Sequence, residues 1–511
     1  MNHRVRAVLV AGLLVPGVGL TQVAPPVRVA PPAPDAQARL PPGAAAFGQA
    51  CAECHGANGE GGAGPALLGP VFKQGGNAES LTNSIRHGYP PNMPPFEATL
   101  SEAQIKSVVD FLTRTAKGPS GPALLPNSQG RTMPGSYAVH VPTGVVHTSV
   151  HDFRVETVAK VSEPYALDFL PDGRILITEI VGRLRIVANG HLLPEAVIGA
   201  PTGDVRGMPQ PQKRPLLSIA VHPDYKKNGW IYLLHARAAT SAVPETTNLV
   251  TITRGRLSHG HWVDSQDIFS VPAQKTNSLR MKFDSKGYLY VGTPYDRSDH
   301  PPADSFARYE GPGADWPSQD LANPMGKIFR MKDDGSVPAD NPFVNTPGAY
   351  PYVFSYGHRE SMGLTFDAQG ELWQSEDGPR GGDEVNHIKK GHNYGWPLIT
   401  WGHAYQTRAV TAYPEAEGLD QPVVSWAPSP AVSDIEYYSG KAFPRWRGSF
   451  FVGSLKQRDL FRITVDGDRV TLVETVLHDL QRIRDIATGP EGFVYLLTDS
   501  GDLVRLVPVR Q

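Results

Sequence analysis

The chain contains 511 residues, of which 40% are hydrophobic and 19% are charged, and its formal net charge is −2. At roughly 100–200 residues per domain, this length predicts two or three folded units. The lack of a basic excess excludes a protein that binds nucleic acid through its phosphates. The 52 glycines and 48 prolines favour many short strands joined by turns.

The N-terminal residues have the pattern of a secretory signal. Arg4 and Arg6 precede an apolar run from Ala7 to Leu20. This run is shorter than the roughly 18 apolar residues that a membrane span requires. We therefore predict a signal peptide at 1–24, no stable membrane span, and a periplasmic or secreted location. A retained amphipathic anchor is the alternative.

Composition then divides the chain into a helical unit between two linkers. Residues 25–42 and 118–150 are rich in Pro, Gly, Ala or Ser and lack a hydrophobic period, which is typical of linkers. Between them, 43–117 is predicted to form short helices. Ser101 is a suitable N-cap for the last of these. Its apolar stripe comprises Ile105, Val108, Val109 and Leu112.

The sequence CAECH at 51–55 is a haem-attachment motif. Cys51 and Cys54 supply the two thiols, and His55 is the predicted iron ligand. Met93 follows His55 by 38 residues (93 − 55) in a Pro-rich loop and is the predicted second ligand, with His87 as its rival. A thioether opposite a His suits electron transfer. The unit resembles the class I monohaem cytochromes c.

From residue 151 to the end, one phrase recurs. Each copy has an apolar residue, a turn containing Gly and a β-rich run, which indicates two strands joined by a tight turn. The copies occupy 168–179, 220–236, 282–293, 365–376, 437–454 and 488–499. They predict a six-bladed β-propeller over 151–511, with a pair of β-sandwiches as the alternative. The predicted fold is multidomain: a small all-α cytochrome c domain followed by an all-β six-bladed propeller.

The second unit resembles a known enzyme family. The phrases that carry the resemblance lie at 215–225, 326–343, 355–367 and 374–397. They are similar to those of the soluble pyrroloquinoline quinone (PQQ) dependent sugar dehydrogenases, the glucose/sorbosone and aldose sugar dehydrogenases. The resemblance spans about 155–508 and implies a propeller that binds PQQ and calcium.

The resemblance also implies particular cofactor ligands. Arg359, Lys456, Arg482 and Arg484 match the positions that hold PQQ in the family. PQQ is a tricarboxylate, and guanidinium groups bind carboxylates through paired hydrogen bonds. Gly378 and Pro379 match the loop whose backbone carbonyls hold the family's Ca²⁺ ion, an oxygen-ligand environment that suits this ion.

One catalytic position departs from the family pattern. If Arg280 is aligned, Thr276 stands where the family has its basic His. A Thr does not titrate near neutral pH, so another group must accept the substrate proton. The candidates are Lys275, Asp377 and His300, with Arg359 as a further catalytic residue.

We therefore predict a quinohaemoprotein dehydrogenase. A sugar or related alcohol or aldehyde would reduce PQQ, and haem c would pass the electrons to a soluble cytochrome or a terminal oxidase. One alternative is a calcium-dependent propeller hydrolase, such as a lactonase. Another is a non-catalytic binding propeller linked to an electron-transfer cytochrome.

Overall fold

The computed structural model describes the propeller and parts of the helical unit. The described residues are 43, 46–47, 50–51, 55, 67, 78–88, 93–117, 123–126, 141–203, 216–238, 248–273, 278–295, 316–402, 410–411 and 413–509. The predicted signal peptide 1–24 and linker 25–42 lie outside them. Within the described residues, none of the helices has the length and apolarity needed to cross a bilayer.

The described part of the helical unit contains two of the short helices that were predicted for it. They are α3 (Ala78–His87) and α4 (Glu102–Lys117). The N–H of Gln104 donates to Oγ of Ser101, and the N–H of Ser101 donates to Oε1 of Gln104, which is the reciprocal capping expected there. The predicted stripe of α4 is buried, with Ile105 and Val108 at most 1% exposed.

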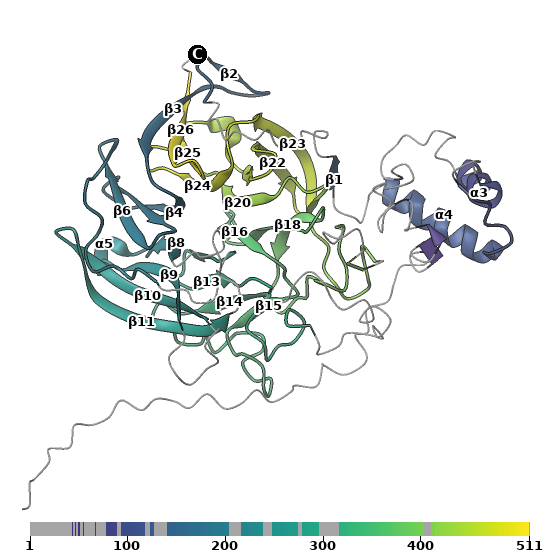
Figure 1. Cartoon of the computed structure of the whole chain (residues 1–511), viewed down its shortest axis with the longest axis horizontal. Helices are drawn as coiled ribbons and strands as arrows, with labels where there is room; N and C mark the ends of the chain where they lie inside the picture. Colours follow the sequence, from purple (N-terminus) through teal and green to yellow (C-terminus); the bar gives the residue numbers. More distant parts are fainter. Residues whose placement is uncertain are drawn as a thin grey trace, which may run out of the picture.

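The predicted six-bladed propeller is confirmed. In the described part of the chain, the strands form six sheets of four or five strands around a central axis (Figure 1). The first three blades contain β4 (Pro164–Phe169), β5 (Ile175–Glu179), β6 (Arg183–Ala188), β7 (His191–Leu192); β8 (Leu216–Val221), β9 (Ile231–Ala238), β10 (Asn248–Ser258), β11 (His261–Ala273); and β12 (Arg280–Phe283), β13 (Leu289–Gly292), β14 (Lys327–Met331), β15 (Val353–Tyr356). The other three contain β16 (Ser361–Phe366), β17 (Leu372–Glu376), β18 (Asp383–Ile388), β19 (Val424–Ala427), β1 (Ala123–Pro126); β20 (Val432–Tyr437), β21 (Phe450–Ser454), β22 (Leu460–Asp466), β23 (Arg469–Leu477); and β24 (Ile483–Thr488), β25 (Val494–Thr498), β26 (Asp502–Pro508), β3 (Asp152–Lys160), β2 (Val146–His147).

Each recurring phrase forms the inner hairpin of one blade. In two copies, Asp284 and Asp367 accept backbone N–H groups two and four residues ahead. Gly287 and Gly370 then adopt φ values of 84° and 82°, a left-handed conformation that favours glycine. Two other hairpins carry a short helix where the phrase predicted a tight turn. These are α5 (Tyr225–Asn228) and the 3₁₀ turn η2 (Pro444–Trp446).

The ring is closed by a strand from the start of the propeller sequence. β3 pairs antiparallel with β26 in the last blade, and Lys160 forms a 2.9 Å ion pair with Asp502 across the pair. β1 and β2 fall inside 118–150, where we predicted a linker. β1 pairs in parallel with β19, so a long-range ladder, rather than its own sequence pattern, makes it a strand.

Inner-strand side chains also join neighbouring blades. At five of the six junctions, a side-chain oxygen of one blade accepts an N–H from the inner strand of the next. The pairs are Asp168–Val221, Ser218–Met281, Thr365–Tyr437, Asp434–Ile486 and Asp485–Leu167. At the remaining junction, Nε of Arg280 donates to the carbonyl of Met362 at 2.7 Å. These bonds fix the inner strands, and therefore the site above them, in one arrangement.

Candidate active site and haem-attachment site

Two of the predicted haem-attachment residues, Cys51 and His55, lie one helical turn apart. The N–H of His55 donates to the Cys51 carbonyl at 3.0 Å, and both side chains are buried. Met93 packs against the apolar cluster that contains Cys51. His87 instead points to solvent, with 63% of its side chain exposed, and its Nδ1 lies 3.6 Å from Glu97. Cys54 lies outside the described residues. This arrangement supports Met93 over His87 as the second ligand.

The propeller topology brings the predicted quinone ligands to one end of the central axis. In each blade, the segment before the inner strand and the loop between the second and third strands lie at the same end. Arg359 precedes β16, whereas Arg482 and Arg484 stand at the start of β24. Gly378 lies between β17 and β18, and Lys456 lies between β21 and β22. Five residues that are far apart in the sequence therefore border one mouth.

Arg359 lies beside the predicted calcium loop. It is 4% exposed, and its Nη1 donates to the carbonyl of Asp377 at 2.6 Å and lies 3.9 Å from the Asp377 carboxylate. The next residue, Gly378, is tightly enclosed, because a Cβ there would come within 2.2 Å of the Gly381 carbonyl oxygen. The loop is thus folded so that backbone groups, rather than side chains, fill its interior.

Arg482 and Arg484 share one carboxylate that sequence reasoning missed. Asp499 accepts hydrogen bonds from Nε of Arg482 at 2.8 Å and from Nε and Nη2 of Arg484 at 2.7 and 2.8 Å. Burial alone would raise the pKa of Asp499, but the two guanidinium groups hold it below its ordinary value. Asp499 is the last residue of the sixth phrase, and nothing in that phrase distinguishes it from a turn residue.

Further hydrogen bonds connect these groups around the mouth. Nη1 of Arg482 donates to the carbonyl of Leu455, next to Lys456. The N–H of Lys456 donates to the Pro430 carbonyl, and the N–H of Ser429 donates to the Arg380 carbonyl. The Lys456 side chain itself is exposed, and among the described residues it forms no ion pair. Hydrogen bonds to backbone carbonyls therefore connect the loops that carry the cationic groups.

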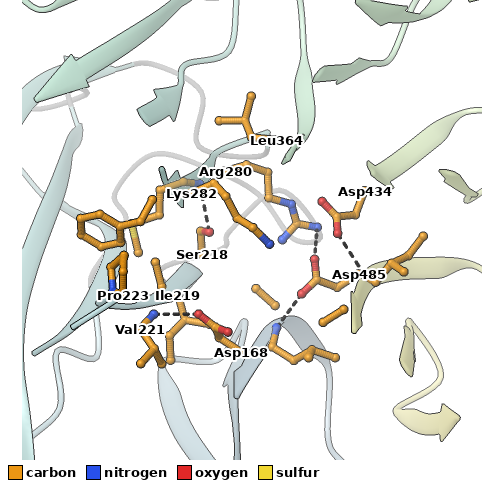
Figure 2. Close-up of a pocket in the computed structure, with 17 residues that line it drawn as sticks. Asp168, Ser218, Ile219, Val221, Pro223, Arg280, Lys282, Leu364, Asp434 and Asp485 are labelled. Carbon is orange, nitrogen blue, oxygen red and sulfur yellow. Dashed lines mark hydrogen bonds and ion pairs between the residues drawn. The ribbon is translucent and has the colours of Figure 1, made fainter. Parts of the chain in front are cut away.

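A charged channel continues below the mouth. A cavity of about 210 Å³ is lined by the charged side chains Asp168, Arg280, Lys282, Asp434 and Asp485, which are labelled in Figure 2. Arg280 forms its upper end, because its guanidinium donates to carbonyls of three other blades and lies 4.7 Å from the ring centre of Tyr165. In the sequence, Arg280 serves only to align the third phrase, and nothing there predicts this role in the channel.

Burial raises the pKa of acidic side chains that line this channel. It raises the pKa of Asp168 to about 6, and hydrogen bonds from the N–H groups of Val221 and Phe169 oppose the shift. Burial and the charge of Asp485 hold the pKa of Asp434 well above its ordinary value. The pKa of Lys282 is raised by Glu436, whose carboxylate lies 3.3 Å away. Burial thus favours the neutral form of the acids in this channel, whereas Glu436 favours the charged form of Lys282.

Of the three candidate bases, only Asp377 falls within the described residues. Lys275 and His300 lie outside the described residues, as does Thr276. Asp377 is described, and 23% of its side chain is exposed at the mouth. It is therefore the one candidate base whose position beside Arg359 is known.

The fold and the mouth together define a class of protein: a haem-binding helical unit joined to a six-bladed propeller with a cationic mouth. Residues 161–505 match the family model described as glucose/sorbosone dehydrogenase, and residues 38–112 match that of the cbb3-type cytochrome c oxidase subunit III. The chain belongs to the glucose/sorbosone dehydrogenase family and carries a cytochrome c domain.

Relatives with known names agree with this family. The aldose sugar dehydrogenase YliI of Escherichia coli is 36% identical over 68% of this chain and 91% of its own length. The crystal structure of the soluble E. coli aldose sugar dehydrogenase in the apo form has a TM-score of 0.59, with 34% identity over 70% of this chain and all of that one. The PQQ-bound aldose sugar dehydrogenase of Streptomyces coelicolor has a TM-score of 0.53, with 26% identity over 70% of this chain and 98% of that one.

Proposed function

We propose that this protein is a periplasmic quinohaemoprotein that oxidises a sugar or a related alcohol or aldehyde with PQQ and passes the electrons through haem c. The observation that carries the proposal is the ring of cationic groups around the mouth, formed by Arg359, Lys456, Arg482 and Arg484. A hydrolase such as a lactonase has no use for a tricarboxylate clamp. The names of the similar dehydrogenases also support sugar oxidation.

The residues at the mouth fit PQQ. Asp499 engages Nε and Nη2 of Arg484 and Nε of Arg482, and within the described residues Nη1 of Arg484 and Nη2 of Arg482 have no hydrogen bond and can donate to a carboxylate. Guanidinium groups that are already held in place lose less conformational entropy when they bind carboxylates. Lys456 adds an exposed ammonium group. The cofactor, when bound, accepts two electrons from the substrate.

The calcium loop fits a hard cation. Gly378 admits no side chain, and its N–H is held by Oδ1 of the buried Asp383 at 3.0 Å. Backbone carbonyls of Gly378 and Pro379 are the oxygen ligands that Ca²⁺ prefers. We propose these two carbonyls as calcium ligands, and Asp377, beside them, as the group that accepts the substrate's hydroxyl proton.

The cytochrome unit fits covalently bound haem c. We propose that Cys51 and Cys54 attach the haem and that His55 and Met93 ligate its iron, a ligand pair suited to electron transfer. The electrons would then leave to a soluble cytochrome or a terminal oxidase. The proposal of a periplasmic location is supported by the signal-like residues 1–24.

The test is reduction of the haem in the purified holo-cytochrome. PQQ and Ca²⁺ are added first, and a panel of aldoses and polyols follows. Haem reduction that requires both PQQ and one class of substrate supports the proposal. PQQ binding without reduction places the substrate outside the panel. If the protein fails to bind PQQ at all, the mouth has another use, and lactone hydrolysis and ligand binding by the propeller are tested next.

A further inference from the structure

One segment of the propeller contacts the cytochrome unit. Tyr413, partly buried, packs against the apolar cluster of that unit, which contains Cys51, Phe47 and Val108, and Met93 and Phe96 pack against the same cluster. The Tyr413 carbonyl accepts a hydrogen bond from the Thr400 N–H at 3.0 Å. The backbone of Tyr413 is therefore tied to that of Thr400.

The same segment packs against the calcium loop on its other side. A Cβ on Gly402 would lie 2.0 Å from the Gly381 carbonyl oxygen and 3.2 Å from Cδ of Pro379. A Cβ on Gly382 would lie 2.8 Å from Oγ1 of Thr400. Such distances leave no room for a side chain or a water molecule. The contact between the loop at the quinone site and Thr400 is thus direct.

The short connection between α4 and β1 also keeps the cytochrome unit close to this blade. α4 ends at Lys117, and β1 begins at Ala123, in parallel pairing with β19. The six Cα–Cα steps between them (123 − 117) span at most about 20–22 Å. β19 belongs to the blade whose β17–β18 loop carries Gly378 and Pro379. Figure 1 shows α3 and α4 beside this blade.

We propose that this blade is the docking face of the cytochrome domain, with Tyr413 as its anchor, and that electrons pass from the quinone site to the haem while the domain is docked there. The inference rests on the proposed function. Oxidation of one sugar hydroxyl group releases two electrons and two protons. The electrons reduce the ferric haem one at a time, the protons pass to water, and an external one-electron acceptor reoxidises the haem after each transfer.

The chemistry of the contact suits this role. A single aromatic anchor against an apolar cluster gives a defined contact, because buried aromatic residues dominate the binding energy of small interfaces. The short tether through β1 keeps the local concentration of the cytochrome domain high, so a small contact is sufficient.

The test uses the full chain with attached haem and three variants. Tyr413→Glu places a charge in the apolar contact, and Tyr413→Phe retains the ring. Ile198→Glu is the matched control, because Ile198 is an exposed apolar residue that pairs with Gly260 and Trp262 beside the β10–β11 turn, at the end of the propeller opposite the mouth. Substrate-driven haem reduction is followed by stopped flow, and reduction of an added two-electron dye reports oxidation at the quinone site alone. Amide hydrogen exchange of 94–100 and 413–419, without PQQ, reports docking independently of activity.

We expect Tyr413→Glu to slow haem reduction about tenfold, the equivalent of weakening the contact by one aromatic anchor. Dye reduction should be unchanged, and exchange in 94–100 should rise. Tyr413→Phe and Ile198→Glu should behave as the wild type. Unchanged haem reduction and unchanged exchange in Tyr413→Glu would overturn the docking proposal while leaving the proposed function intact.

Two further outcomes are also decisive. If the wild type reduces neither haem nor dye, the proposed function fails, and hydrogen exchange alone decides whether the domains dock. If Tyr413→Glu lowers the rates of both haem reduction and dye reduction, a variant with ten Gly and Ser residues inserted after Lys117 provides the test instead. A selective loss of haem reduction in that variant supports the tethered docking face, and equal rates overturn it.

Discussion

Asp499 is expected to stabilise the propeller by holding two arginines together. Its carboxylate binds Arg482 and the almost fully buried Arg484, whose side chain is 4% exposed. Asp499→Asn removes the charge but retains the shape. Removing one partner of a buried ion pair costs about 3–5 kcal/mol, and we take the lower figure because Arg482 is partly exposed. At about 2.1 cal/mol/K per residue, a propeller of about 350 residues has an unfolding entropy of about 0.7 kcal/mol/K, so about 3 kcal/mol lowers Tm by about 4 °C.

The stability contribution of Asp499 should change with pH in one direction. Because the folded-state pKa of Asp499 lies below its ordinary value, the carboxylate stabilises the fold above the unfolded pKa of about 3.9 and loses that effect as the pH falls through the folded-state pKa. The Tm difference between wild type and Asp499→Asn should therefore be constant from pH 7 to pH 5 and shrink below pH 4.

The assay is thermal unfolding of the PQQ-free protein, followed by circular dichroism at each pH. The control is Asp466→Asn, because Asp466 and Arg469 form an ion pair with about three-quarters of each side chain exposed. An exposed pair of this kind contributes about 0–1 kcal/mol. If Asp499→Asn melts like Asp466→Asn at pH 7, or if its deficit persists unchanged below pH 4, the reasoning about the shared carboxylate is refuted.

Three other predictions concern the haem ligand, the quinone ligands and the channel. Met93→Ala should leave haem attached but open the sixth iron site, as a high-spin absorption spectrum would report; a low-spin spectrum identical to the wild type would point to His87, and His87→Ala is the matched control. Lys456→Ala and Arg484→Ala should each weaken PQQ binding in an equilibrium titration by about tenfold or more and leave the haem spectrum intact, since each removes a charge-assisted hydrogen bond; unchanged affinity in both would remove them from the site. The pKa of Asp168 is raised to about 6, so the folded state binds its proton more tightly than the unfolded state between about pH 4 and pH 6, and this group's contribution to stability falls as the pH rises through that window. The Tm advantage of the wild type over Asp168→Asn should therefore be larger at pH 4.5 than at pH 7, and a constant difference would contradict the shift.

Local patterns in the sequence predicted the elements that are stabilised locally. The capping residue and apolar stripe of α4 are both within one helix, so they could be recognised without a tertiary model. The inner hairpins were recognisable because Asp284 and Gly287, and their counterparts in other copies, form a turn from adjacent residues. The haem motif is likewise contiguous, since its two thiols and its histidine fall within five residues.

Only the tertiary structure decided the features that join distant residues. β1 and β3 become strands because they pair with β19 and β26, and neither partner is visible from the local pattern. Asp499 and Arg280 gained their roles in the same way, since each acts on groups of other segments or blades that are brought together at the central axis. The sequence by itself determined the two kinds of domain and most of the candidate ligands. The closure of the ring, the shared carboxylate and the contact through Tyr413 depend on long-range packing, which no short stretch of the chain encodes.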